Sequence, residues 1–329
     1  MDVPDYIYSI RDGDYEKGLE LMYRTNPFPA TCGRICTRRC ESVCPVGILG
    51  EPVAIRWLKR FIVDQVDAKD YKRILNEPIT ETGHKVAIIG AGPGGLSAAY
   101  YLRQQGHAVT VFEAEASGGG MLRYGVPSYR LPDADLDKDI DHIASLGVDI
   151  RYNTKVGKDV TFEKLLEDYD ALFMSTGLSI PSSLRLQGED HPRVLSGLQV
   201  LADVANGRDP GIGKKVAVIG GGNVAMDAAR VSRRFGADVT ILYRRRISEM
   251  PADEEEIHES QEEACTIVQQ AIPVELVDAD SPEQVCIKWG EAEMVDDPKG
   301  GRPRPILQED RMHTETYDSI ISAIGQGSN

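Results

Sequence analysis

Apolar positions in the first part of the chain recur at spacings of three and four residues, which predicts helices. Two such patterns, PDYIYSIRDG and DYEKGLELMYRT, precede Pro27 and Pro29, which end the second of them. A third pattern, EPVAIRWLKRFIVDQV, carries one apolar stripe and has Pro52 in its first turn. Residues 1–80 are therefore predicted to form a small helical domain.

From Lys85 the pattern changes to short apolar strands that alternate with helices. KVAIIG, SAAYYLRQQG and AVTVFEA form a strand–helix–strand unit. The same order returns from Lys215 as KKVAVIG, NVAMDAARVSRRFG and DVTILYRR. The strands at 170–177 and 317–325 also resemble each other, and each ends in glycine. Such spacing indicates a duplication of whole domains.

Composition and charge narrow the choice of partners. The 329 residues include 37 lysines and arginines against 52 aspartates and glutamates, a net charge of −15. An acidic surface repels phosphate backbones, so no nucleic-acid partner is expected. No apolar run approaches the ~18–20 residues of a membrane span, and the first residues do not read as a signal peptide. The expected location is cytoplasmic.

The first repeat contains a glycine-rich G-x-G-x-x-G loop between its strand and its helix. The loop consists of Gly90, Ala91, Gly92, Pro93, Gly94 and Gly95. Glycines there permit a tight turn and a close approach of the backbone to a pyrophosphate on the helix amides. Glu113 ends the next strand, where an acid accepts hydrogen bonds from a ribose diol. The alternative is a glycine-rich turn beside a surface glutamate.

The second repeat has a similar loop but a different strand end. Its loop consists of Gly220, Gly221, Gly222, Asn223, Val224 and Ala225. The strand that follows ends in Arg244, Arg245 and Arg246, which suit a 2′-phosphate and favour NADPH over NADH. The alternative is a solvated basic run. The two repeats together suggest FAD followed by NADPH.

The positions of the cysteines argue against a flavin disulfide reductase, which needs a closely spaced cysteine pair at the flavin. Residues 85–264 contain no cysteine, and Cys265 and Cys286 are too far apart to form such a pair. Electrons must therefore leave the flavin for another group. The visible candidate is a cysteine cluster near the start of the chain.

That cluster places four cysteines within 13 residues, at Cys32, Cys36, Cys40 and Cys44. This arrangement suits a [4Fe-4S] cluster, with a zinc site or buried thiols as alternatives. In one continuous helix the four would span about 18 Å. Either the segment is irregular, or the cysteines serve different clusters.

These motifs together resemble the glutamate synthase small-subunit family. That family includes the N-terminal half of dihydropyrimidine dehydrogenase and the large subunit of NADH-dependent ferredoxin:NADP oxidoreductase. The matching text includes NPFPATCGRICTRRCESVCPVG, VAIIGAGPGGLSAAYYL, VAVIGGGNVAMDAAR and YRRRISEMPADEEEI. The resemblance implies that NADPH reduces FAD and that electrons pass to iron–sulfur clusters and a larger catalytic or electron-accepting subunit. Two rival functions are an electron-bifurcating NADH/NADPH:ferredoxin transhydrogenase subunit and a nucleotide-binding scaffold that has lost flavin.

The resemblance also implies further contacts. FAD contacts beyond the first loop and Glu113 fall on Gly120, Met121, Arg130 and Val156. Ala323 and Gly325 lie near NADPH. Catalysis is expected to be positioning of the nicotinamide against the flavin, and no catalytic acid or base is named.

The expected fold is α/β, with two Rossmann-like dinucleotide-binding domains, one inserted in the other, after the small all-helical cysteine-containing domain. The FAD-binding domain is expected at 81–189 and 313–329, with the strand 317–325 returning to it. The NADPH-binding domain is expected at 190–312.

Three departures from the family pattern stand out. Relatives place further cluster cysteines upstream of this sequence. Lys59 stands where relatives have a glutamine or glutamate ligand. The closing segment of the family, which touches the flavin, is missing after Asn329. We therefore expect a fragment, or a subunit completed by its neighbours, that holds at most one cluster.

Overall fold

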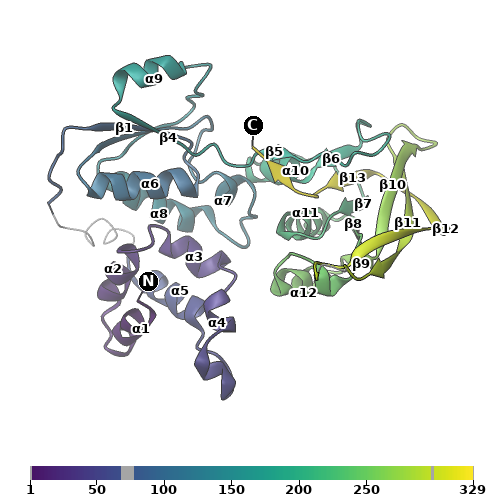
Figure 1. Ribbon diagram of the computed structural model, residues 1–329, viewed down its shortest axis with the longest axis horizontal. Helices are drawn as coiled ribbons and strands as arrows, with labels where there is room; N and C mark the ends of the chain where they lie inside the picture. The colour runs from purple at the N-terminus through teal and green to yellow at the C-terminus, as the bar shows by residue number, and fades with distance from the viewer. Residues whose placement is uncertain (1, 68–77, 298–299, 329) are drawn as a thin grey trace. The chain divides into compact units, whose positions relative to one another are not determined.

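The computed structural model describes residues 2–67, 78–297 and 300–328, which form two compact units (Figure 1). One unit contains the chain up to Arg123 together with Ser128–Gly177. The other contains Tyr124–Pro127 and the chain from Leu178 onward. No helix among the described residues has the length and apolar character needed to cross a membrane.

The first unit begins with short helices, which confirms the predicted helical region up to Gln65; residues 68–77 of the predicted 1–80 region lie outside the described residues. They are α1 (Val3–Arg11), α2 (Tyr15–Tyr23), α3 (Pro29–Ile35), α4 (Arg39–Ser42) and α5 (Ile55–Gln65), with a 3₁₀ turn at Pro45–Ile48. The carboxylates of Asp2 and Asp14 cap α1 and α2 by accepting backbone N–H groups in the first turn. Helix α5 packs against α1, α2 and α3, and buries Ile62 and Val63 completely.

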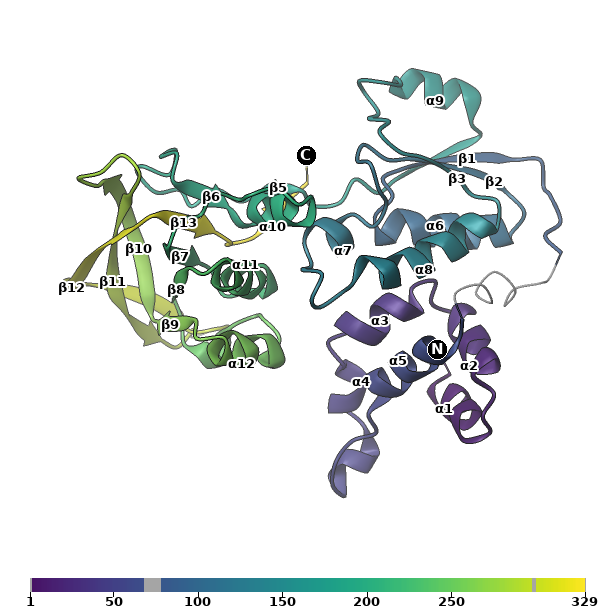
Figure 2. The same ribbon diagram turned by 180° about the vertical axis from the view of Figure 1, so that it is seen from behind.

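A four-stranded parallel sheet forms the rest of this unit, in the order β3-β2-β1-β4. The strands are β1 (Lys85–Ile89), β2 (Ala108–Phe112), β3 (Asp149–Arg151) and β4 (Ala171–Met174). Helices α6 (Pro93–Gln104) and α8 (Asp133–Ser145) cover one face and α9 (Phe162–Asp168) the other, as Figures 1 and 2 show. Because both faces are covered, Val86, Ala87 and Ile88 are consecutive buried residues.

The cysteine-bearing helix α3 is attached to α8 by buried polar contacts. The carboxylate of Asp139 accepts the backbone N–H groups of Ala30 (3.2 Å) and Thr31 (2.9 Å) in the first turn of α3. The guanidinium of Arg34 pairs with Asp135 at 2.8 Å. Burial raises the pKa of Asp139 to about 7, against the stabilising effect of those N–H groups. The helical region therefore shares a buried interface with the first sheet.

The second unit repeats the parallel sheet, here with five strands in the order β6-β13-β7-β8-β9. They are β6 (Val194–Ser196), β7 (Lys215–Ile219), β8 (Asp238–Tyr243), β9 (Thr266–Gln269) and β13 (Ser319–Ser322). Its helices are α10 (Gly197–Ala205), α11 (Asn223–Arg234) and α12 (Glu254–Glu262). An antiparallel sheet follows, of β10 (Ala271–Asp278), β11 (Val285–Val295) and β12 (Arg304–Tyr317). The short strands β5 (Ile180–Pro181) and β14 (Gln326–Gly327) pair with each other.

The two parallel sheets confirm the predicted duplication but correct one of its details. The prediction that strand 317–325 returns to the first domain is wrong, because β13 pairs with β6 and β7 of the second sheet. Its Ile320 and Ile321 are completely buried in the core there. β13 lies beside β7 as β4 lies beside β1. The similarity of the two segments thus reflects equivalent places in two sheets.

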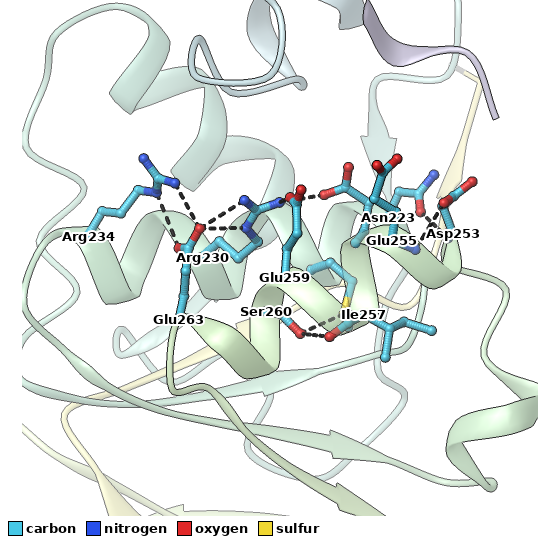
Figure 3. A network of polar contacts seen from close by, with 11 residues as sticks. Asn223, Arg230, Arg234, Asp253, Glu255, Ile257, Glu259, Ser260 and Glu263 are labelled. Carbon is cyan, nitrogen blue, oxygen red and sulfur yellow. Dashed lines mark hydrogen bonds and ion pairs between the residues drawn. The ribbon is translucent and has the colours of Figure 1, made fainter. Parts of the chain in front are cut away.

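A network of charged residues joins α11 to α12 (Figure 3). The side chain of Arg230 is 5% exposed and contacts the carboxylates of Glu256, Glu259 and Glu263 at 2.6–2.8 Å. Glu263 also pairs with Arg234, at 2.8 Å. These contacts fix α12 along the helix that begins at the second glycine loop.

Candidate functional site

The first glycine loop connects β1 to α6, and its conformation needs glycine at two positions. Gly90 has φ +102°, and a Cβ there would lie 2.4 Å from the carbonyl oxygen of Ser175. A Cβ on Gly95 would lie 2.0 Å from the carbonyl oxygen of Gly90. The first glycine therefore allows the turn, and the last allows α6 to approach it closely, as the sequence predicted.

Gly92 has a different role, because a Cβ there would meet only the Cα of Gly120, at 3.9 Å. Gly92 is also the N-cap of α6, so the first backbone N–H groups of that helix lack partners within the helix. Gly120 closes the other side of this space, since its own Cβ would lie 2.9 Å from the Cα of Gly92. The backbone N–H of Gly119 donates to Ala91 O at 2.8 Å, which holds the two segments together. The result is a backbone cradle that fits a pyrophosphate.

Glu113 lies at the end of β2, beside this cradle. It is 9% exposed, and its carboxylate accepts the backbone N–H groups of Ala91 (2.7 Å) and Glu115 (2.9 Å). Each carboxylate oxygen thus uses one lone pair and keeps another acceptor position. This geometry suits the ribose contact predicted from the sequence.

The structure separates the remaining residues predicted at this site. Met121 begins the short helix α7 (Met121–Tyr124), directly after Gly120. Val156 packs against the buried cluster that contains Phe112. Arg130 is half-buried in the segment before α8. Only Met121 is adjacent to the cradle in sequence, so the FAD contacts of Arg130 and Val156 stay predictions.

The second glycine loop opens into a cavity of about 670 Å³, within the range typical of cofactor sites. Gly220 has φ +145°, and a Cβ there would lie 2.2 Å from Ala323 O. A Cβ on Gly221 would lie 2.5 Å from the ring of Tyr243, whereas at Gly222 it would meet nothing within 4 Å. The constrained Gly220 and the open Gly222 therefore correspond to Gly90 and Gly92 of the first loop.

Most of the predicted NADPH residues line this cavity together. The lining includes Gly220, Gly221, Gly222, Asn223, Val224, Arg244, Arg245, Ala323 and Gly325. Ala225 does not line it and is completely buried in α11, where a small residue allows close packing. Asn223 also accepts the backbone N–H of Asp253 through Oδ1 at 2.8 Å, which ties the start of α12 to the loop.

Sequence reasoning missed one charged residue of the cavity. Arg302, just before β12, lines the same space as Arg244. The two are far apart in sequence and no motif connects them, so only the antiparallel strands β11 and β12 reveal their shared site.

The four cysteines lie in an irregular segment, which is one of the two alternatives that the length argument left open. Cys32 is in α3, Cys36 ends that helix, Cys40 is in α4, and Cys44 precedes the 3₁₀ turn. The structure does not bring three potential ligands among the His, Cys, Asp and Glu side chains of the described residues into one metal-binding group. Their role as cluster ligands stays a prediction.

The environments of the outer two cysteines differ. Backbone N–H groups, led by that of Val53, lower the pKa of the half-buried Cys44 thiol. Such donors suit a cluster-bound thiolate. Burial raises the pKa of Cys32, and the ammonium of Lys59 opposes that rise. Lys59 is itself 8% exposed, so a cation lies where the family pattern has a ligand.

Comparison with known families decides the relationship. Residues 84–269 match the model described as pyridine nucleotide-disulphide oxidoreductase, which is more than half of the chain. The chain belongs to the pyridine nucleotide-disulphide oxidoreductase family. Residues 1–71 match dihydropyrimidine dehydrogenase domain II, 4Fe-4S cluster. The predicted order of a 4Fe-4S-type helical region before a dinucleotide-binding part is thereby confirmed.

Individual members of this oxidoreductase family confirm the predicted resemblance. The glutamate synthase [NADPH] small chain of Escherichia coli K12 is 31% identical over 98% of this chain and 71% of its own length. The NADPH-Fe(3+) oxidoreductase subunit beta of Geobacter sulfurreducens is 38% identical over 99% of this chain and 49% of its own. The NADP(+)-dependent formate dehydrogenase subunit beta of Moorella thermoacetica is 40% identical over 100% and 50%. The chain thus spans about half the length of the latter two.

Solved structures of this oxidoreductase class share the fold. FprA of Mycobacterium tuberculosis in complex with NADPH superposes with a TM-score of 0.64, at 19% identity, over 74% of this chain and 71% of that one. At this identity the comparison supports the fold only.

Proposed function

We propose that this chain is an NADPH-dependent electron-input module, which takes hydride from NADPH onto FAD and passes electrons to iron–sulfur clusters and a partner subunit. The observation that carries the proposal is that the strands beside two equivalent glycine loops end in side chains of opposite charge. The first has a buried carboxylate, Glu113, at its strand end, whereas the second has Arg244 and Arg245 facing a cavity. An acid selects a ribose diol and arginines select a 2′-phosphate.

At the first loop, this chain would hold the FAD pyrophosphate on the backbone N–H groups that begin α6. Glu113 would orient the adenosine ribose, because its position is fixed by Ala91 and Glu115. When bound, FAD would act as the electron carrier, because a flavin can accept a hydride and release electrons singly. The contribution of the protein is the orientation of that carrier.

At the second loop, the open position Gly222 lets the NADPH pyrophosphate approach the start of α11. Arg244 is exposed and makes no hydrogen bond or ion pair with the described residues, so its guanidinium can bind a phosphate. Arg245 donates through Nε to Pro303 O at 3.2 Å. Hydride transfer depends chiefly on positioning, so the proposal assigns it no side-chain acid or base.

Cys36, Cys40 and Cys44 are the proposed cluster ligands, with Cys32 as the fourth thiol of the segment. An iron–sulfur cluster would supply one-electron transfer there. Disulfide reduction is not part of the proposal, since residues 85–264 contain no cysteine.

The names of the relatives support the proposal of a partner subunit. Two are beta subunits and one is a small chain, so a larger catalytic or electron-accepting subunit is the proposed recipient of the electrons. The proposed location is the cytoplasm.

Anaerobic purification followed by titration with NADPH tests this function. The expected result is a bound flavin whose absorbance bleaches with NADPH and returns when a one-electron acceptor is added. A chain that binds NADPH but no flavin would instead be a nucleotide-binding scaffold. Ferredoxin reduction that requires a second, exergonic acceptor would identify an electron-bifurcating enzyme.

A further inference from the structure

We propose that Arg302, just before β12, recognises the 2′-phosphate of NADPH together with Arg244 and so completes the specificity site. This inference rests on the proposed NADPH function. Arg302 precedes β12, far in sequence from the arginines that end β8, yet it lines the same cavity as Arg244 and the open Gly222.

The charges around the cavity point to an anion. The chain has more acidic than basic residues, and many of its described arginines pair with carboxylates; Arg304, for example, pairs with Asp297 at 3.6 Å. Neither Arg244 nor Arg302 makes a hydrogen bond or ion pair with any described residue. Two cations that face one cavity repel each other, and an anion bound between them offsets this repulsion. A phosphate monoester, with its charge and acceptor oxygens, satisfies two guanidinium groups.

Hydrogen bonds to backbone carbonyl groups hold Arg302 near the end of β8. The Arg245 guanidinium donates to the carbonyl oxygen of Pro303, the residue after Arg302, at 3.2 Å. The carbonyl oxygen of Arg245 accepts the N–H of Gln270 at 2.9 Å, and Gln270 donates through Nε2 to Ala292 O in β11 at 2.7 Å. Arg245 thus has a positioning role as well as its charge.

The positive charge of Arg302 could serve either of two phosphate groups of the nucleotide, the pyrophosphate or the 2′-phosphate. A guanidinium at the pyrophosphate would strengthen NADH and NADPH binding alike. A guanidinium at the 2′-phosphate would strengthen only NADPH binding. Since Arg302 shares the cavity with the strand-end arginines, and the pyrophosphate position at Gly222 is already served by the start of α11, we assign it to the 2′-phosphate.

Binding of 2′,5′-ADP and of 5′-ADP to the purified full chain, measured by isothermal titration calorimetry, tests this assignment. In Arg302→Ala the Kd for 2′,5′-ADP should rise about tenfold or more, while the Kd for 5′-ADP stays the same. Arg302→Lys should recover part of the affinity. Arg304→Ala is the matched control, because Arg304 pairs with Asp297 and does not line the cavity; both its Kd values should equal those of the wild type.

Two results would overturn the assignment: equal weakening of both ligands in Arg302→Ala, or no change in either. Failure of the underlying function looks different. There the wild-type chain itself would bind 2′,5′-ADP no better than 5′-ADP, whatever the variants do.

Discussion

The carboxylate of Glu113 accepts the backbone N–H of Ala91 at 2.7 Å, which fastens the end of β2 to the glycine loop after β1. One acidic side chain therefore does two jobs in the proposed FAD site. It fixes the loop that receives the pyrophosphate, and it offers its remaining acceptor positions to the ribose. The loss of this side chain should affect flavin binding more than folding.

Glu113→Ala should retain little FAD. Hydrogen bonds to a charged group contribute about 1.5–3 kcal/mol, so the Kd for FAD should rise at least about tenfold. Flavin content after purification and reconstitution of the apoprotein measure this. Glu115→Ala is the control, because that side chain is exposed and only its backbone N–H contacts Glu113. Equal FAD affinity in the two variants would contradict the ribose contact.

Neutral replacement of both Arg244 and Arg245 should strongly reduce the preference for NADPH, since Arg302 alone would then face the 2′-phosphate. Each charge-assisted hydrogen bond to the 2′-phosphate is worth about 1.5–3 kcal/mol. The KM for NADPH should rise, while the KM for NADH changes little. Arg246→Gln is the control, since Arg246 is not among the residues that line the cavity. If the double variant keeps its preference, these arginines are only surface charges.

Arg230→Met should strongly destabilise the second unit. It would leave Glu256, whose side chain is 8% exposed, as a buried carboxylate without its guanidinium partner, and such losses cost about 3–5 kcal/mol. Arg234→Gln removes a pair at a site that is 47% exposed and should cost at most about 1 kcal/mol. Urea unfolding compares the two free energies. Small losses of unfolding free energy in both variants would show that the ion pairs of Figure 3 contribute no more than surface pairs do.

Asp139 should make the stability of the first unit depend on pH. Its pKa is raised from 3.8 to about 7, so between these values the folded state holds a proton that the unfolded state has released. The free energy of unfolding should therefore fall as the pH rises through this window. Asp139→Asn cannot titrate, and its stability should fall less. Urea unfolding at about pH 5 and about pH 8 compares the slopes; identical slopes would contradict the raised pKa.

The 329-residue chain should hold at most one four-iron cluster. Two such clusters require about eight protein ligands, whereas this segment supplies Cys32, Cys36, Cys40 and Cys44. Of the other two cysteines, Cys265 is buried, and burial raises its pKa to about 11, which disfavours a thiolate. Iron and acid-labile sulfide per chain, after anaerobic purification, measure the content. About eight irons per chain would require ligands from positions assigned here to other roles.

The features predicted best from the sequence are those that depend on residues close together in the chain. The loop around Gly92 and the strand end at Glu113 follow from local turn chemistry and a fixed strand–helix–strand spacing. Contacts between distant segments were not visible. The Asp139 carboxylate meets Thr31 across 108 positions, and Arg302 reaches its cavity only through an antiparallel pair of strands. The place of β13 lay in between, because its likeness to β4 was plain but was assigned to the wrong sheet.

Because α3 is attached to α8, the N-terminal helical region cannot be exchanged between proteins as an independent domain. The 4Fe-4S-type region matches a family description of its own, which invites its transplantation onto another flavoprotein. Yet the first turn of α3 and the guanidinium of Arg34 find their buried partners in Asp139 and Asp135. A chimera that ended at residue 67 would carry unmatched donors into its new host. A workable graft must bring α8, or a recipient helix with both carboxylates in register.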